Sequence, residues 1–317
     1  MHLISQHQLF EPWLQLKHPL VRQLAFAVAS PNILSALPLE LDIQHAFHFH
    51  PSQIWQQQFQ TYLSRLKQLD QDPKELEDFM AQLKSTRLGL RFEMFMWFWL
   101  LDHRYHAYEL LGHSIQIIDG ARTTGELDFL IKNTETNQVE HWEVALKYYL
   151  GETNLSLTTW YGLNRTDTLN RKLKHFTHKQ FQFQQALNTD IQARFAVLKG
   201  QLFLPLINGF TAVDTLNQYA LPDWLNPDRR LGTWGNVIPT TDLNYYRLQR
   251  QEWICPNAEV SSQNAHWWTN GLYLQNQNTF SASKLPTPTE ITPSASVCGV
   301  CESVPTQVSG KAKPSRF

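Results

Sequence analysis

The sequence predicts an α/β protein, because stretches with helical spacing lie on both sides of stretches with the length of strands. Apolar segments at 125–131 and 141–150 are joined by a short polar link, which is the pattern of a β-hairpin. Apolar residues recur at three- and four-residue spacing at 76–83, 92–100 and 169–187. This spacing predicts helices before and after the hairpin.

Residues 1 to about 70 are expected to form an N-terminal extension of several short helices. Helical spacing is present at 20–28, but prolines interrupt this part of the chain repeatedly. At Asp72-Pro73-Lys74-Glu75, a capping residue, a proline at the first helical position and a glutamate three residues after the cap predict the start of a helix. Gly89 separates this helix from a second one that is strongly apolar.

Residues 71–210 are expected to form the core of the fold. Ile115 to Ile118 have the pattern of a first strand, Asp119-Gly120 that of a turn, and the hairpin adds two more strands. After a polar link at 151–168, a long helix is expected over 169–187, with Gln180 in its apolar stripe. Another strand is expected at 201–206.

Two further segments complete the predicted organisation. Residues 211–275 are rich in aromatic side chains and are expected to form a β-rich extension that could contact a second copy or a protein partner. Residues 276–317 are rich in Ser, Thr and Pro, which predicts a disordered tail. Cys298 and Cys301 in this tail are spaced like half of a zinc site. Cys255 and His266 could complete it, so structural zinc stays an open alternative.

Composition excludes several classes of protein. The formal net charge is −1, so any affinity for nucleic acid must come from a local basic patch. The longest apolar run, 94–101, is too short to cross a membrane, and the first residues do not have the pattern of a signal peptide. Three cysteines do not make a disulfide framework, which fits a reducing cytoplasm.

Each strand of the predicted hairpin contains one acid, Asp128 or Glu143, where a core strand would carry an apolar residue. Because buried charges need a partner, these acids predict a bound cation. Neighbouring strands lie about 4.8 Å apart, so both carboxylates could share one face of the sheet. Lys147 would point to that face as well, and such a set suits Mg²⁺ or Mn²⁺ with a lysine that orients or deprotonates water.

The predicted helix after residue 168 is basic outside its apolar stripe. Arg171, Lys172, Lys174 and Lys179 lie in it, and Arg165 just precedes it. A solvated charged face is one explanation of such a cluster. Beside a metal-binding pair of acids, the cluster is instead where a phosphate backbone would be held.

The order of these motifs resembles the PD-(D/E)XK nuclease superfamily. The resemblance is carried by Leu-Gly-Leu-Arg-Phe-Glu ending at Glu93, Gly-Glu-Leu-Asp ending at Asp128, and His-Trp-Glu-Val-Ala-Leu-Lys around Glu143, followed by the basic helix. It implies a restriction-endonuclease-like αβββαβ core with a mixed central sheet, one or two divalent metals, and DNA as the usual substrate. Glu93 and Asp128 would be metal ligands, and Glu143 the acid of the strand motif.

A closer resemblance is to the bacterial family called domain of unknown function 1853. It rests on Arg-Leu-Gly-x-x-Phe-Glu, His-Trp-Glu-Val-Ala-x-Lys-Tyr-Tyr-Leu-Gly, Arg-Thr-Asp-x-Leu-x-x-Lys-Leu and Leu-Phe-x-Pro, and it spans most of residues 5–255. This family implies a fold rather than a reaction.

The chain departs from the superfamily pattern at Ala145, where the lysine of the strand motif is expected. The Cα atom of Lys147 would lie about 13 Å from that of Glu143 on a regular strand, so Lys147 reaches the metal only through a bulge. Alternatively, Lys172 or Lys179 supplies the charge, and Gln180 contacts substrate or a metal-bound water.

The expected function is therefore a Mg²⁺- or Mn²⁺-dependent nuclease, with DNA as the expected partner and no membrane. Asp128, Glu143 and Lys147 would be catalytic, and Glu93 would support the metal. Two other functions compete with this one. The first is a catalytically inactive nucleic-acid-binding or assembly module, which would be consistent with Ala145. The second is a hydrolase of a small phosphorylated metabolite, which would not need the basic helix.

Overall fold

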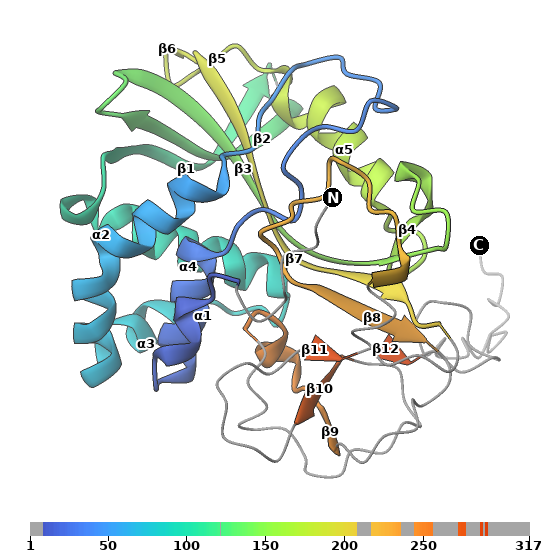
Figure 1. Ribbon diagram of the computed structural model, residues 1–317. Coiled ribbons are helices and arrows are strands. Elements are labelled where there is room, and N and C mark those ends of the chain that lie inside the picture. Colours follow the sequence, from blue (N-terminus) through green and yellow to red (C-terminus); the bar gives the residue numbers. More distant parts are fainter. Residues whose placement is uncertain are drawn as a thin grey trace, which may run out of the picture.

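The computed structural model describes residues 9–120, 122–207, 217–235, 244–255, 272–276, 286–287 and 289–290 (Figure 1). Its helices are α1 (Pro19–Ala29), α2 (Ser52–Gln71), α3 (Lys74–Met80), α4 (Leu88–Leu101) and α5 (Leu169–His178). The main sheet contains β1 (Tyr108–Asp119), β2 (Arg122–Asn133), β3 (Gln138–Gly151), β4 (Trp160–Gly162), β7 (Ala193–Pro205), β8 (Leu231–Gly235) and β12 (Thr289–Glu290). Smaller sheets contain β5 (Gln185–Ala186), β6 (Thr189–Asp190), β9 (Asn244–Arg247), β10 (Tyr273–Asn276) and β11 (Pro286–Thr287).

The main sheet is mixed, with strand order β1-β2-β3-β7-β8-β12, and β4 pairs with β3. β1, β2 and β3 are antiparallel neighbours, whereas β3, β7 and β8 run parallel. Helices α1–α4 cover one face of the sheet and α5 covers the other, as Figure 1 shows. The prediction of an α/β protein is therefore confirmed, and so is the hairpin at 125–131 and 141–150.

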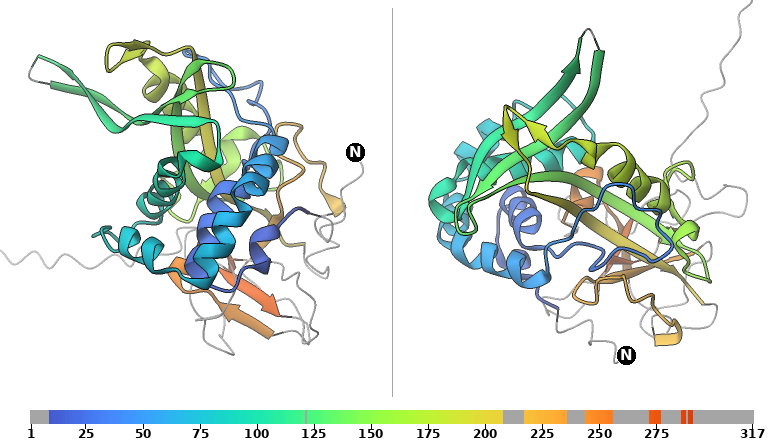
Figure 2. Two further views of the ribbon diagram at one scale, coloured as in Figure 1. Left: turned by 90° about the vertical axis from the view of Figure 1, so that its left-hand side faces the viewer. Right: turned by 90° about the horizontal axis from the view of Figure 1, so that it is seen from above.

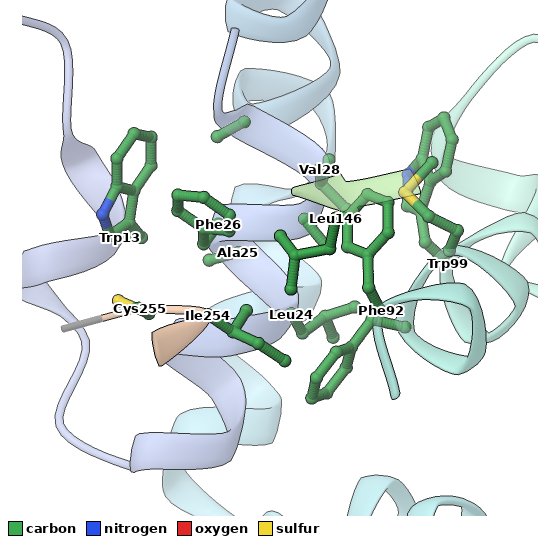
Figure 3. Close-up of a cluster of buried hydrophobic side chains, with 14 of the residues drawn as sticks. Trp13, Leu24, Ala25, Phe26, Val28, Phe92, Trp99, Leu146, Ile254 and Cys255 are labelled. Atoms are coloured by element: carbon green, nitrogen blue, oxygen red, sulfur yellow. The ribbon is translucent and has the colours of Figure 1, made fainter. Parts of the chain in front are cut away.

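Alternation along β3 divides the core into two layers. Trp142, Val144 and Leu146 point into the cluster formed with α1, α2 and α4, whereas Ala145 and Tyr149 point into the cluster that contains α5. Figure 3 shows Leu146 among side chains of α1 and α4. Both faces of β3 are thus buried. Glu143 lies on the same side as Ala145, toward α5.

Three sequence predictions need correction. The helix expected over 169–187 ends at His178, and the chain continues through a 3-10 turn at Gln180–Gln182 into the β5–β6 hairpin. Leu187 and Asn188 have φ values of 50° and 59°, so these two residues form the turn of that hairpin. In the N-terminal extension, α2 is a single helix of 20 residues rather than a short one.

The third correction concerns the predicted tail. Residues 286–287 pair with β10 and residues 289–290 pair with β8, so this stretch belongs to the sheets. Cys255 is buried and packs in the hydrophobic cluster of Figure 3. The other zinc-ligand candidates, His266, Cys298 and Cys301, lie outside the described residues. Among the described residues, no helix is long and apolar enough to cross a membrane.

Close contact between β3 and β7 depends on Gly200, which has φ +127° and pairs with Lys147. A Cβ atom at Gly200 would lie 1.8 Å from the Lys147 carbonyl oxygen. We therefore expect Gly200→Ala to lower the free energy of unfolding by about 2–5 kcal/mol in urea denaturation. Gly89→Ala in α4 is the matched control, because a Cβ atom there meets nothing within 4 Å. Equal effects of the two substitutions would contradict this account.

Candidate active site

The candidate site lies where β2 and β3 separate. The two strands pair only from Phe129 and Trp142 to Asn133 and Gln138. Before Phe129, β2 stays paired with β1 as a two-stranded ribbon that projects from the body in both views of Figure 2. β3 instead continues along β7. The backbone ladder between β2 and β3 therefore stops at Asp128 and Glu143.

We call the point where β2 and β3 separate, at Asp128 and Glu143, the fork. Carboxylates replace backbone acceptors there. The Val144 amide donates a hydrogen bond to Asp128 Oδ2 at 2.8 Å, and the Asp128 amide points at Glu143 Oε1 at 3.4 Å. The Glu143 side chain is completely buried, while Asp128 is partly exposed. The two acids thus sit side by side and compensate for the missing strand pairing.

A chain of hydrogen bonds connects Glu143 to the basic helix. Gln180, in the turn after α5, donates its Nε2 to Glu143 Oε2, and Lys172 Nζ donates to Gln180 Oε1 at 2.9 Å. Lys172 Nζ also lies 3.9 Å from the centroid of the Phe176 ring. This geometry brings Lys172, rather than Lys147, next to the acids.

Two histidines hold two of the acids. His141 Nε2 lies 2.7 Å from Glu143 Oε1, and His113 Nε2 lies 2.8 Å from Glu93 Oε1. Burial lowers the pKa of His141 to about 3, so its ring is neutral. Its Nδ1 is buried without a hydrogen-bond partner in the described structure. His141 Nε2 donates to Glu143 when that carboxyl group is ionised and accepts from it when it is protonated.

Glu93 approaches from α4, and its partner is His113 rather than the neighbouring Arg91. Arg91 donates instead to Gln23 Oε1 at 2.9 Å. Ser114, with φ 49°, places its Oγ 3.4 Å from Glu93 Oε1 and 3.2 Å from His113 Nε2. Because the serine and the glutamate meet the same ring nitrogen, this group is not a Ser-His-Glu catalytic triad.

Burial and mutual repulsion perturb the charged groups at the fork. Burial, followed by the charge of Glu143, raises the pKa of Asp128 well above its ordinary value. Burial raises the pKa of Glu143 to about 8, against the opposing charge of Lys172. Burial also lowers the pKa of Lys172 to about 8, although both acids oppose this. Burial at the fork thus opposes the ionised form of both acids.

Lys147 lies elsewhere. Its Nζ forms an ion pair with Asp167 Oδ2 at 2.6 Å. The register of β3 on β7 is continuous from Glu140 to Leu150, so no bulge brings Lys147 toward Glu143.

The structure divides the predicted nucleic-acid-binding residues into groups. Arg165 pairs with Glu152 at 3.0 Å and lies over the Tyr161 ring, and Lys179 is exposed at the end of α5. Arg171, Lys172 and Lys174 line an open hollow of about 610 Å³ beside the fork. The residues that line the hollow are Lys147, Thr166, Asp167, Arg171, Lys172, Lys174, His175 and His178.

The donors at the fork suit a hard divalent cation. In the described part of the chain, no three His, Cys, Asp or Glu side chains converge closely enough to hold a metal ion. Mg²⁺ does not require such a cage, because proteins usually bind it through one or two carboxylates together with waters and substrate phosphates. The carboxyl oxygens of Asp128 and Glu143 fit this requirement, and a bound cation would favour the ionised forms that burial opposes.

Comparison with protein families gives one match. The family model described as "Domain of unknown function (DUF1853)" matches residues 22–291. The chain belongs to the DUF1853 family. The matched span contains the fork, α5 and every strand of the main sheet. Searches of the curated proteins and of the solved structures give no significant match.

Sequence reasoning about this DUF1853 chain missed the two histidines. His141 could have been found, because it lies two residues before Glu143 and alternation places both on one face of β3. The pairing of His113 with Glu93 had no such signal, since the two residues come from a strand and a helix that meet only in the folded protein.

Burial of Asp128 beside Glu143 predicts an unusual dependence of the free energy of unfolding on pH for this DUF1853 protein. Asp128 has a folded-state pKa above its unfolded value of 3.8, so the stability it contributes is present at acidic pH and is lost as pH rises. The isosteric Asp128→Asn keeps an acceptor for the Val144 amide. We expect it to raise the free energy of unfolding by about 1–3 kcal/mol at pH 8, with little effect near pH 4.

Urea denaturation at several pH values measures this difference. Asp167→Asn is the control, because Asp167 has a cationic partner and its loss should cost up to about 1 kcal/mol. A stability loss for Asp128→Asn at every pH would show that Asp128 only caps the backbone.

Proposed function

We propose that this protein is a metal-dependent phosphodiester hydrolase that acts on nucleic acid, with DNA as the expected substrate. The observation that carries the proposal is the pair of adjacent acids at the fork, of which Glu143 is linked through Gln180 to Lys172 beside a basic hollow. Apart from the short strands β4, β5 and β6, the elements follow the order α4-β1-β2-β3-α5-β7, which matches the αβββαβ order of PD-(D/E)XK nucleases and supports this reading.

Each residue has a proposed role. Asp128 and Glu143 would hold Mg²⁺ or Mn²⁺, and Glu93 would add negative charge from the α4 side. When bound, the ion would polarise a phosphoryl oxygen and make a coordinated water more acidic. Lys172, with a pKa of about 8, can exchange a proton with an attacking water near neutral pH. Gln180 positions that lysine, and His141 orients Glu143.

Lys172 takes the place of the missing strand lysine for a packing reason. Ala145 is buried in the cluster that α5 completes, next to apolar side chains such as Leu169 and Leu173. A long charged side chain at position 145 would have to displace these contacts. A lysine on the helix itself brings the ammonium to the acids from above the sheet.

A non-catalytic binding module is the second candidate. The bonds that Gln180 and His141 make to Glu143 favour it, because they occupy both oxygens of that carboxylate. In this reading the fork would be a structural feature and the hollow would bind nucleic acid without cutting it.

Titration of Mn²⁺ into the protein by calorimetry separates the two candidates. For the hydrolase, we expect wild type to bind Mn²⁺ and to cleave plasmid or single-stranded DNA in its presence. Asp128→Ala and Glu143→Ala should lose both properties. Binding without cleavage would favour the second candidate. No binding of Mn²⁺ by wild type would contradict the metal site.

Replacing Lys172 and Lys147 one at a time tests which lysine is catalytic. We expect Lys172→Met to lower the cleavage rate at least about a hundredfold while Mn²⁺ binding persists, because a proton-transfer group is lost. Lys147→Met removes a charge paired with Asp167 and should change the rate by less than about tenfold. The reverse order of effects would assign the role to Lys147.

A further inference from the structure

The basic hollow follows one face of α5. Arg171, Lys174, His175 and His178 recur at the three- and four-residue spacing of a single helical stripe. From Arg171 to His178 this stripe extends about 10.5 Å along the helix. Lys147 and Thr166 line the hollow from outside the helix.

Few of these cations are neutralised. Asp167 is the only acid among the residues that line the hollow, and it pairs with Lys147. Arg171 donates to the Thr166 carbonyl oxygen and Lys172 to Gln180, and these neutral acceptors do not cancel the charge of either cation. With neutral histidines and a protonated Lys172, four cations and one carboxylate leave a net charge of about +3.

Mutual repulsion is visible at His175. Burial, and then the charges of Lys172, Arg171, Lys179 and Lys147, lower the pKa of this ring. α5 contains no acid that would relieve the repulsion. The cations of α5 are therefore not offset by any acid of the same helix, whereas Asp167, which precedes the helix, pairs with Lys147.

Charge spacing distinguishes an extended ligand from a small one. Along one strand of a nucleic acid, the charges follow one another at about 3.4 Å of axial rise, so a stripe of about 10.5 Å faces about three phosphates. Their charge would balance that of the hollow. A small phosphorylated metabolite would contact only one turn of α5, about 5.4 Å long, and leave the other cations unpaired.

We infer that the hollow is a strand-binding groove, which holds about three consecutive phosphates of one nucleic acid strand without any metal. Lys172 lines the groove and is linked through Gln180 to Glu143 at the fork. One phosphodiester linkage of the bound strand therefore lies close to Asp128 and Glu143. This inference names the substrate class of the proposed hydrolase and rests on that proposal.

The test measures binding in EDTA, where no hydrolysis takes place. Fluorescence anisotropy of labelled oligothymidylates of two to ten nucleotides gives affinity as a function of length and of salt. We expect affinity to rise steeply up to about four nucleotides, with a slope of log K against log salt of about −2. Arg171→Gln combined with Lys174→Gln should weaken binding at least about tenfold and flatten the slope by about 1.4.

Two controls make the result specific. Lys67→Gln combined with Lys84→Gln removes two exposed lysines on the other side of the sheet and should change neither quantity. Asp128→Ala should keep the affinity for oligonucleotides, because the groove does not need the metal. Circular dichroism confirms that each variant is folded.

Two outcomes overturn the inference. Thymidine monophosphate or inorganic phosphate that competes as well as a hexanucleotide would show a pocket for a single phosphate. An unchanged salt slope in the Arg171→Gln/Lys174→Gln variant would show a merely solvated face. Strand binding without Mn²⁺ binding or cleavage would support the groove and contradict the proposed hydrolase. Cleavage with an unaltered salt slope in the variant would support the hydrolase and contradict the groove.

Discussion

The structure depends on the loss of pairing between β2 and β3 at residues 128 and 143. Buried backbone amides need acceptors. In the part of β2 that precedes Phe129, β2 and β3 no longer provide acceptors for each other. Carboxylate side chains take over at this point. Two acids are thereby forced together inside the protein, and their pKa values rise. A gap in the β-ladder in this way places two carboxyl groups with raised pKa values side by side.

Helix α5 supplies the opposite charge, because its two sides meet different surroundings. Leu169, Leu173 and Phe176 bury one side against the sheet. The remaining side carries the cations of the groove, and Lys172 lies between the two. The same helix thus completes a core layer and presents positive charge beside the acids. The ion pair of Lys147 with Asp167 lies at the edge of this surface.

Histidines set the orientation of the acids. The neutral His141 ring places its Nε2 2.7 Å from Glu143 Oε1, and His113, stacked on Trp97 with 4.3 Å between ring centroids, faces Glu93. Each carboxylate oxygen that receives such a bond is fixed in direction, whichever cation the other oxygens meet. Since two acids are held by different elements, the site depends on the packing of α4 against the sheet as well as on β3 itself.

Local periodicity and the cost of burying charge were enough to predict the hairpin, the apolar helices around it and the two acids at the fork from sequence. The helix predicted at α5 was too long, because its apolar spacing continues to Leu187 although the chain leaves the helix after His178. Which lysine meets the acids depends on the tertiary fold. Strand geometry left Lys147 and the helical lysines as alternatives, and the choice depends on how α5 packs over Ala145, a contact between residues distant in the chain. The partner of Glu93 was decided in the same way.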